Sequence, residues 1–187
     1  DNGTSALDSS GSANTGTLTN TPARSETVSS TIGFDDPYSL SFDGTNDYVD
    51  CTDINAIDGI ANFSVSQWIN MNNVSSLQVF SSKSDAGATV GWFLQNYNSV
   101  KDQVLFAFGS GSLPQGVTPS VLSAGSWAHV TAVFDGSGAT NADRLKIYFN
   151  GVNQTLTFTG TIPATILATS TSMQIGGWQG GTAYFNG

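Results

Sequence analysis

The strongest constraint in this sequence is a succession of short runs rich in β-branched and aromatic residues, which begins at Tyr38. Gly, Asn, Asp or Pro residues separate the runs, and several runs alternate polar and apolar residues. Short strands with frequent turn signals are typical of an antiparallel sandwich. We therefore predict an all-β fold made of two antiparallel sheets. The runs are SLSF, DYVDC, FSVSQWIN, LQVFSSK, VGWFLQNY, QVLFAFG, WAHVTAVFD, LKIYFN, QTLTFTG and MQIGG.

One hairpin is specified in detail near residue 150. Leu145, Ile147 and Phe149 alternate with more polar residues, and the pair Asn150-Gly151 follows them. Asn-Gly is the preferred pair for a type I′ turn, because both central residues of that turn need a positive φ. The sequence therefore predicts a strand over residues 145–149, a two-residue turn and a returning strand that begins at Val152.

The chain of 187 residues divides into a polar leader and one domain. Residues 1–33 are mostly small and polar, so we expect a leader that is mobile or lies along a sheet edge, with one short strand at Thr15–Thr19. Residues 34–187 carry the strand runs and form the predicted sandwich. No repeat with a period of about 20–50 residues is visible, so a solenoid or propeller is not indicated.

Composition excludes several classes of partner. Apolar residues make up 39% of the chain, which is too many for a disordered protein. The net charge is −9, from 5 Lys+Arg against 14 Asp+Glu, so no basic patch is available to bind nucleic acid or an anionic membrane. No apolar run approaches the roughly 18 residues of a membrane span, so membrane insertion is not expected. Charged residues are only 10% of the chain, and Ser, Thr, Asn and Gly replace them, as is common on secreted and virion proteins.

Several stretches, taken in order, resemble a known family. The chain is similar to the laminin-G-like members of the concanavalin-A-like lectin/glucanase superfamily, in the version found in bacterial and phage surface proteins. The resemblance implies a jelly-roll sandwich. Its matching stretches are residues 8–11 and 16–18 in the leader, SLSFDGTNDYVD (39–50), FSVSQWI (63–69), Trp127–Val130 with residues 134–136, LKIYFNGV (145–152) and residues 173–177.

The C-terminal sequence departs from the family pattern. Family members usually follow the segment YFNG with a further strand that begins Ile-Asp, whereas here the sequence given ends at Tyr184-Phe185-Asn186-Gly187. A sandwich that lacks its closing strand has an open edge and an exposed core. We expect either a further segment of chain or strand donation by another subunit.

The residues needed for glycoside hydrolysis are not evident. The glucanases of this superfamily need a pair of carboxylates, and the chain has a single glutamate, Glu26, in its leader. The adjacent Asp35 and Asp36 would point to opposite faces of a strand, and Asp47 and Asp50 also differ in parity. We therefore predict that the domain is not an enzyme.

The single histidine and single cysteine are also better explained by structure. His129 lies in the WAHV run and matches a family position that we interpret as structural, and one His with one Cys cannot supply a zinc site. Cys51 has no partner for an internal disulfide. Its two interpretations are a small, semi-buried strand residue or a reactive or intermolecular thiol.

A calcium site is predicted at the loop Asp43–Asp47. This loop places two carboxylates, from Asp43 and Asp47, and the amide of Asn46 around a glycine turn, and calcium prefers oxygen ligands of this kind. The resemblance implies a structural calcium near this hairpin and the C-terminal strand, where Asn186 and the Gly187 carbonyl could contribute. The alternative is a turn held by hydrogen-bonding side chains alone.

A carbohydrate site is predicted on loop aromatics and nearby amides. Trp178 lies in the stretch GGWQGG, where small neighbours would leave its ring accessible. Core packing is the alternative for each aromatic residue, and Trp68 and Trp127 match family positions that we interpret as packing residues. The candidate ligand-binding residues are Trp92, Asn96, Tyr97, Asn98, Trp178, Gln179 and Tyr184.

Together these features predict a non-catalytic extracellular recognition module, with carbohydrate on a cell or matrix surface as the expected ligand. The alternative is a structural or assembly domain of a virion, fibre or cell envelope, whose partners would be surface proteins or copies of itself. Either function fits a domain displayed on a bacterial envelope or a phage virion.

Overall fold

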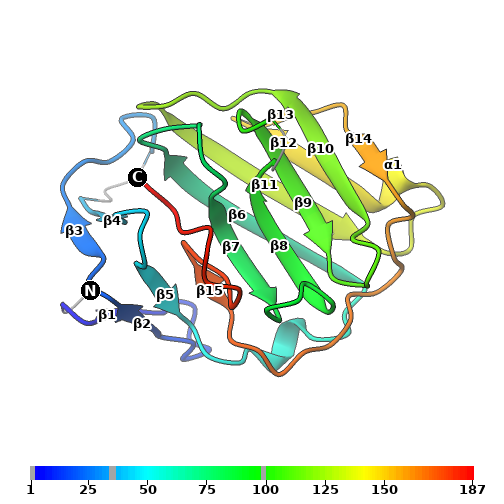
Figure 1. Cartoon of the computed structure of the whole chain (residues 1–187), viewed down its shortest axis with the longest axis horizontal. Coiled ribbons are helices and arrows are strands. Elements are labelled where there is room, and N and C mark those ends of the chain that lie inside the picture. The colour runs from blue at the N-terminus through cyan, green and yellow to red at the C-terminus, as the bar shows by residue number, and fades with distance from the viewer. Residues whose placement is uncertain (1–2, 34–36, 98–99) are drawn as a thin grey trace.

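The chain forms two antiparallel sheets that pack face to face, together with a short two-stranded ribbon (Figure 1). The computed structural model describes residues 3–33, 37–97 and 100–187. Helix in these residues is limited to one turn of α-helix, α1 (Asn141–Arg144), and one turn of 3-10 helix, η1 (Asn55–Ile57). The predicted all-β sandwich is therefore confirmed.

The larger sheet has nine strands and the smaller sheet has four. In spatial order, the nine-stranded sheet is β1 (Ser5–Ala6), β2 (Gly16–Thr19), β5 (Tyr48–Asp50), β15 (Gln174–Ile175), β7 (Val79–Ser84), β8 (Gly91–Asn96), β9 (Gln103–Phe108), β10 (Gln115–Ser120) and β14 (Thr157–Thr159). The four-stranded sheet is β13 (Val152–Asn153), β12 (Leu145–Phe149), β11 (Trp127–Asp135) and β6 (Asn62–Asn70). The ribbon pairs β3 (Ala23–Ser25) with β4 (Ser39–Ser41).

The core lies between the two sheets and follows from strand alternation. In β11 every second residue is buried, from Ala128 to Phe134, and the residues between them are less buried. Across the core, Trp92 of β8 stacks on Phe106 of β9, with ring centroids 5.6 Å apart. Each large side chain that is buried in this way stabilises the fold by about 1.5–3 kcal/mol.

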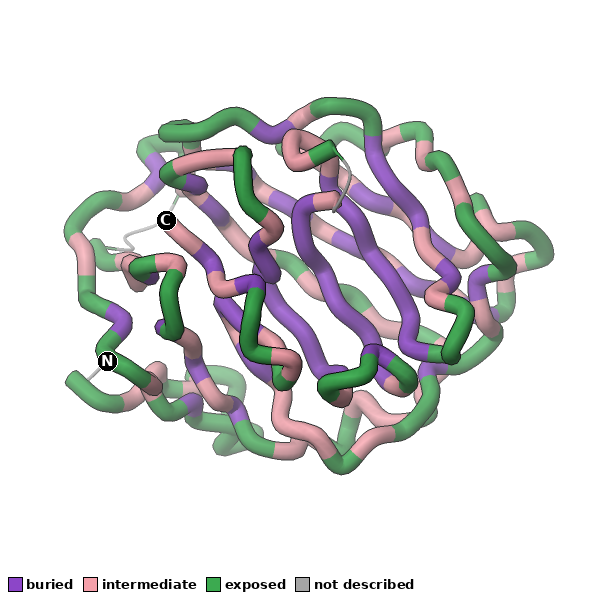
Figure 2. Tube along the Cα trace, viewed as in Figure 1, coloured by how far each residue is buried: buried purple, intermediate pink, exposed green. Residues whose placement is uncertain are grey.

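Figure 2 shows that β8 and β9 are buried along almost their whole length. Since adjacent residues point to opposite faces, burial on both faces means that the outer face of these strands is also covered by side chains. This outer face carries the candidate site described below.

The polar leader contributes strands to the larger sheet and to the two-stranded ribbon. β1 and β2 extend the larger sheet, where Leu18 pairs with Val49 of β5, and β3 pairs with β4. The strand expected at Thr15–Thr19 is present as β2.

The predicted hairpin is confirmed, whereas α1 was not predicted. Asn150 and Gly151 have φ values of 50° and 78°, as a type I′ turn requires, and Phe149 pairs with Val152. The returning strand is only two residues long, because the chain then crosses to β14 of the larger sheet. α1 begins with a capping box in which Thr140 and Asp143 bond each other's backbone N–H groups. The spacing Thr-x-x-Asp is a sequence signal for such a start.

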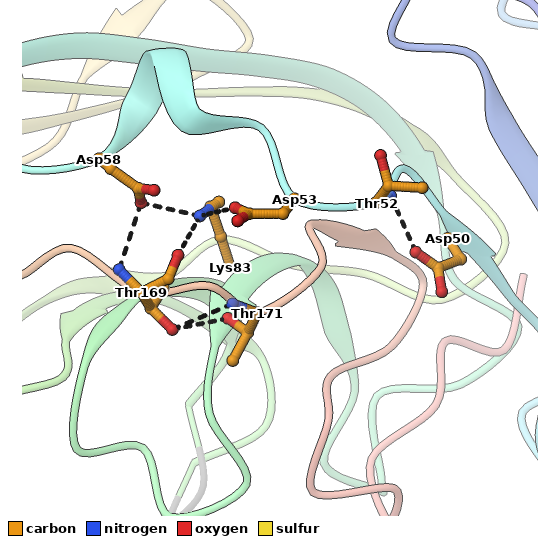
Figure 3. Close-up of polar contacts among 7 residues, drawn as sticks. All are labelled: Asp50, Thr52, Asp53, Asp58, Lys83, Thr169 and Thr171. Carbon is orange, nitrogen blue, oxygen red and sulfur yellow. Dashed lines mark hydrogen bonds and ion pairs between the residues drawn. The ribbon is translucent and has the colours of Figure 1, made fainter.

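A buried cation ties three segments together at one end of β7 (Figure 3). Lys83 is 1% exposed, and its Nζ donates to Asp58 Oδ1 at 2.7 Å and to the Thr169 carbonyl at 2.6 Å. Asp53 Oδ1 lies 2.8 Å from Nζ as an ion pair without hydrogen-bond geometry. Because Asp53 and Asp58 flank η1, the cation holds η1 and the loop at Thr169 against the larger sheet.

Candidate functional site

A second apolar cluster lies on the outer face of the larger sheet, apart from the main core. Phe93 of β8 pairs with Ala107 of β9, and Leu105 of β9 pairs with Val117 of β10. These four residues are at most 8% exposed, and Ala88 completes the group. We call these five residues the outer cluster.

Two aromatic side chains border the outer cluster. Tyr97 and Trp178 are half-buried and pack against it, and the Trp178 ring centroid lies 6.4 Å from that of Phe93. A side chain at Gly180 would collide with the indole of Trp178, so the ring lies directly on the Gly180 backbone. The indole Nε1 is buried and has no hydrogen-bond acceptor among the described residues.

Three glutamine side chains share this outer face with the outer cluster. Gln95, Gln103 and Gln115 have the same strand parity as Phe93, Leu105 and Ala107, and Gln95 pairs with Leu105 while Gln115 pairs with Ala107. In the described parts of the chain, none of these three amides has a hydrogen-bond partner. An apolar floor with convergent amide groups is the usual chemistry of a small-molecule site. Each amide can both donate to and accept from neighbouring hydroxyl groups.

The structure brings only some of the predicted ligand-binding residues to this face. Tyr97 and Trp178 lie there, and Gln179 is exposed beside Trp178. Tyr184 instead stacks on Tyr48 of β5, with centroids 6.2 Å apart. Asn98 lies outside the described residues.

Trp92 and Asn96 correct the sequence prediction, because both point into the molecule. Trp92 is 1% exposed and belongs to the core, so it offers no surface to a ligand. Asn96 is fully buried, and its amide donates to two backbone carbonyls and accepts from one backbone N–H. Phe93 and Gln95 are the outward residues of the same strand. The sequence analysis did not identify these two residues. If Trp92 had been assigned to the core, alternation along the strand would have placed Phe93 and Gln95 on the outer face.

Four of the predicted calcium ligands, Asp43, Asp47, Asn186 and Gly187, come from distant parts of the sequence and lie close together. Asp43 pairs with Asn186 in an isolated antiparallel bridge, and Gly44 lies against the Asn186 side chain. Asp43 Oδ1 accepts from the Thr45 N–H at 2.7 Å, which holds the pKa of the Asp43 carboxyl below its usual range. Asn46 is exposed.

Asp47 is the unusual member of this loop. It is 4% exposed, and its Oδ2 accepts from the Asp43 N–H at 3.1 Å. Its Oδ1 is buried without a hydrogen-bond donor among the described residues. Burial raises the pKa of the Asp47 carboxyl, although the bond from Asp43 opposes this effect. An unpartnered buried carboxylate oxygen beside an acidic, amide-bearing loop fits a calcium ion.

The described residues contain no group of three or more His, Cys, Asp or Glu side chains that could bind a metal on their own. A calcium ion here would therefore need amide and backbone oxygens as well as Asp43 and Asp47. The carbonyl oxygen of Gly187 already accepts the N–H of Phe42 at 2.8 Å.

His129 lies on the outer face of the smaller sheet rather than in a catalytic arrangement. Its Nε2 is 2.8 Å from Ser66 Oγ, and its ring lies 5.1 Å from that of Trp68. Together with Trp127 and Asn150, these rings line a hollow of about 500 Å³. Within the described residues no carboxylate bonds His129, so the third group of a catalytic triad is not in place.

Cys51 is buried, with 7% of its surface exposed, and burial raises the pKa of its thiol to about 11. The thiol is therefore protonated at neutral pH, which agrees with the interpretation of Cys51 as a structural residue.

None of the helices in the described ranges is long and apolar enough to cross a membrane.

Comparisons with solved structures show the same fold at low sequence identity. The carbohydrate-binding module CBM40 of the Ruminococcus gnavus IT-sialidase, bound to α2,3-sialyllactose, aligns with a TM-score of 0.58 and 14% identity over 79% of this chain and 82% of that chain. A heptameric SAP-like pentraxin from Limulus polyphemus aligns with a TM-score of 0.51 and 16% identity over 79% of this chain and 70% of that chain.

The mouse laminin α1 chain, domains LG4-5, aligns with a TM-score of 0.52 and 16% identity over 72% of this chain. The present chain covers only 32% of the length of that laminin fragment. No curated protein matches the sequence.

A family model described as the concanavalin A-like lectin/glucanases superfamily, of laminin G type, matches residues 43–187. The match includes the Asp43–Asp47 loop, the whole smaller sheet and the strands of the outer cluster. The chain therefore belongs to the concanavalin A-like lectin/glucanases superfamily.

Proposed function

We propose that this domain is a non-catalytic recognition module that binds carbohydrate on the outer face of its larger sheet. The observation that carries the proposal is the outer cluster, with Tyr97 and Trp178 at its border and, on the same face, three glutamine amides that have no partner among the described residues. A sugar ring presents apolar C–H groups on one side and hydroxyl groups around its edge. The residues of the outer cluster are at most 8% exposed, so the half-buried rings of Tyr97 and Trp178 at its border would contact the apolar side, and the glutamine amides suit the hydroxyl groups.

The charge of this face favours a neutral glycan. Neither lysine nor arginine occurs among the outer cluster, its aromatic border or the three glutamines, and the whole chain has a net charge of −9. An anionic sugar would meet no counter-charge there, and the long-range field would repel it. The proposed ligand class thus differs from the sialyllactose bound by the structurally similar R. gnavus module.

Calcium has a structural role in the proposal. Asp43, Asp47 and Asn186 would hold the ion, with Asn46 and the Gly187 carbonyl as further oxygen donors, and the ion would neutralise the buried Asp47 carboxylate. Because these residues join the Asp43–Asp47 loop to the C-terminal segment, the ion would fasten that segment to the fold. No part of sugar recognition depends on it in this account.

We infer that the domain acts outside the cell or on a displayed surface, such as a bacterial envelope or a phage virion. The low charge and polar surface support this location, and the family resemblance supports it too. The alternative function is assembly with a surface protein or a second copy. It is favoured by one observation, a groove of about 390 Å³ bordered by β6 and the segment that contains β4, whose lining includes Phe42, Phe80 and Phe185.

A glycan array tests the proposed function directly. The chain is screened against neutral and acidic glycans in calcium and again in chelator. Trp178→Ala on the outer face is compared with Trp68→Ala, which removes a partly exposed tryptophan from the outer face of the other sheet. We expect binding of neutral glycans that Trp178→Ala abolishes and Trp68→Ala retains. Binding that only Trp68→Ala abolishes would contradict the proposed site.

A further inference from the structure

The outer face of the smaller sheet carries two tryptophans that lie outside the core. Trp68 of β6 and Trp127 of β11 are half-buried, and neither is among the described residues that form the main core or pack against it. Trp68 pairs with His129, which follows Trp127 by two residues on the same face of β11, so the two indole rings stand diagonally across neighbouring strands. Packing in the core, which the sequence led us to expect for both residues, therefore does not explain these rings.

The two rings form walls of the hollow of about 500 Å³ on this face. A hollow of this size is within the usual range of ligand pockets. The other residues that line it are His129, Asn150 and Thr31 of the leader. Among the described lining residues there is no lysine, arginine, aspartate or glutamate, so the hollow suits an uncharged group.

The hollow has more free hydrogen-bond donors than free acceptors. Trp127 Nε1 is buried and meets no acceptor in the described parts of the chain. Asn150 Oδ1 accepts the His129 N–H at 2.8 Å, so the Asn150 Nδ2 group is left to donate. Ser66 Oγ lies 2.8 Å from His129 Nε2 and 3.0 Å from Thr131 Oγ1, so it is already engaged on both sides. A buried donor without a partner favours a ligand that is rich in acceptors.

This excess of donors favours a proline-rich segment over a sugar. Sugar hydroxyl groups donate as well as accept, and the one amide oxygen of the lining is already used by the His129 N–H. A proline residue has a carbonyl oxygen but no N–H, so a polyproline II helix presents acceptors and apolar rings. Residues three apart in this helix lie about 9 Å from each other. That spacing is close to the roughly 7–8 Å between diagonal positions on neighbouring strands.

We propose that the hollow on the smaller sheet binds a proline-rich segment of a partner protein in the polyproline II conformation. One pyrrolidine ring would pack against the Trp68 ring, and the Trp127 Nε1–H would donate to a backbone carbonyl of the segment. Asn150 Nδ2, on an exposed residue, would supply a second donor. Recognition of this kind uses a preformed helix of low conformational entropy. The site lies on the opposite sheet from the outer cluster, and the proposal does not depend on glycan binding.

The proposal is tested by titrating the whole chain with an uncharged polyproline peptide of about ten residues, which is about three turns of the helix. The readout is the set of indole N–H resonances in nuclear magnetic resonance spectra. The chain has 4 tryptophans, Trp68, Trp92, Trp127 and Trp178, and single substitutions assign their signals. We expect the Trp68 and Trp127 signals to shift saturably while the other two stay in place. A glycine-serine peptide of the same length should shift none of them.

Two variants measure what each tryptophan contributes to affinity. Trp68→Ala should weaken peptide binding at least about tenfold, as expected for an aromatic anchor. Trp127→Phe keeps an aromatic ring but removes the Nε1–H, and it should weaken binding about two- to tenfold. Trp178→Ala on the other sheet is the matched control and should leave the peptide affinity unchanged.

Three outcomes would overturn the proposal. The first is a peptide that shifts no indole signal of the wild-type chain. The second is undiminished peptide binding by folded Trp68→Ala and Trp127→Phe. The third is a neutral glycan that shifts the Trp68 and Trp127 signals where the peptide does not, since the hollow would then be a sugar site.

Discussion

The substitution Lys83→Met tests whether the buried cation stabilises the fold. The lysine ammonium is the shared partner of Asp58, Asp53 and the Thr169 carbonyl, at 2.6–2.8 Å, and methionine would keep most of the stem packing while removing the charge. Removal of one member of a buried ion pair costs about 3–5 kcal/mol, because the remaining charge loses its compensation. The Asp58 and Asp53 side chains are 17% and 32% exposed, so water can partly replace the ammonium. We therefore expect a loss near the lower end, about 3 kcal/mol.

Urea denaturation at neutral pH measures this loss, and calorimetry should show Tm lowered by about 6–12 °C. Lys146→Met is the matched control, since Lys146 lies on the solvent-facing side of β12 and makes one weak bond of 3.3 Å. It should change stability by no more than about 0.5 kcal/mol. Adding Asp53→Asn and Asp58→Asn to Lys83→Met should recover part of the loss. Equal stabilities for Lys83→Met and Lys146→Met would refute this reasoning.

Three further predictions follow from the described contacts. Asp47→Asn should leave Tm in chelator unchanged or higher. Burial raises the pKa of this carboxyl in the folded state, so its ionised form lowers the stability of the fold. The same substitution should abolish any rise in Tm that calcium causes. Cys51 should react with a thiol reagent far more slowly in the folded than in the unfolded chain. Wild type should lose stability relative to Cys51→Ala as pH rises from about 9 to about 11, because the pKa of the thiol is raised in the folded state. Gly91→Ala should lower Tm by several degrees, because Gly91 has a φ of 78° and a Cβ there would overlap the Lys83 carbonyl. An unchanged Tm would contradict this close approach of β8 to β7.

The strand pattern predicted the fold because turn chemistry and alternation are local properties. The Asn150-Gly151 turn is one example, where two residues needing positive φ fix both the turn and the register of the hairpin. The two aspartate partners of Lys83 could not be predicted in the same way, because η1 and the Thr169 loop reach β7 only through the tertiary fold.

The site was difficult to predict mainly because the sequence does not show which side chains of a central strand lie on the outer face of the sheet. β8 is buried on both sides, so its sequence GWFLQN shows no polar-apolar alternation that would tell Trp92 from Phe93. The sequence reasoning assigned Trp92 and Asn96 to the ligand, whereas Phe93 and Gln95 face outward. Trp178 was a candidate because a glycine-rich loop marks an irregular segment, whereas its contact with Phe93 depends on how that loop folds over the sheet.

For the predicted calcium site, the sequence identifies the candidate residues, and the structure shows how they are buried and bonded. The loop Asp43–Asp47 is recognisable from its local composition, and the resemblance pointed to the C-terminal segment. Only the structure shows that one oxygen of Asp47 is buried and that no donor in the described part of the chain reaches it. That orphaned oxygen is a physical reason for a cation, which the number of acidic residues alone does not provide.

The most direct test of the central claim is the affinity of the chain for the neutral glycan that binds best on the array, measured by calorimetry for wild type, Trp178→Ala and Gln95→Ala. We expect saturable binding by wild type, its loss in Trp178→Ala and a clear weakening in Gln95→Ala, with Tm values that show all three proteins folded. Undiminished binding by both folded variants would show that the outer cluster is not the site. An absence of binding to any glycan by wild type would contradict carbohydrate recognition and favour the assembly function.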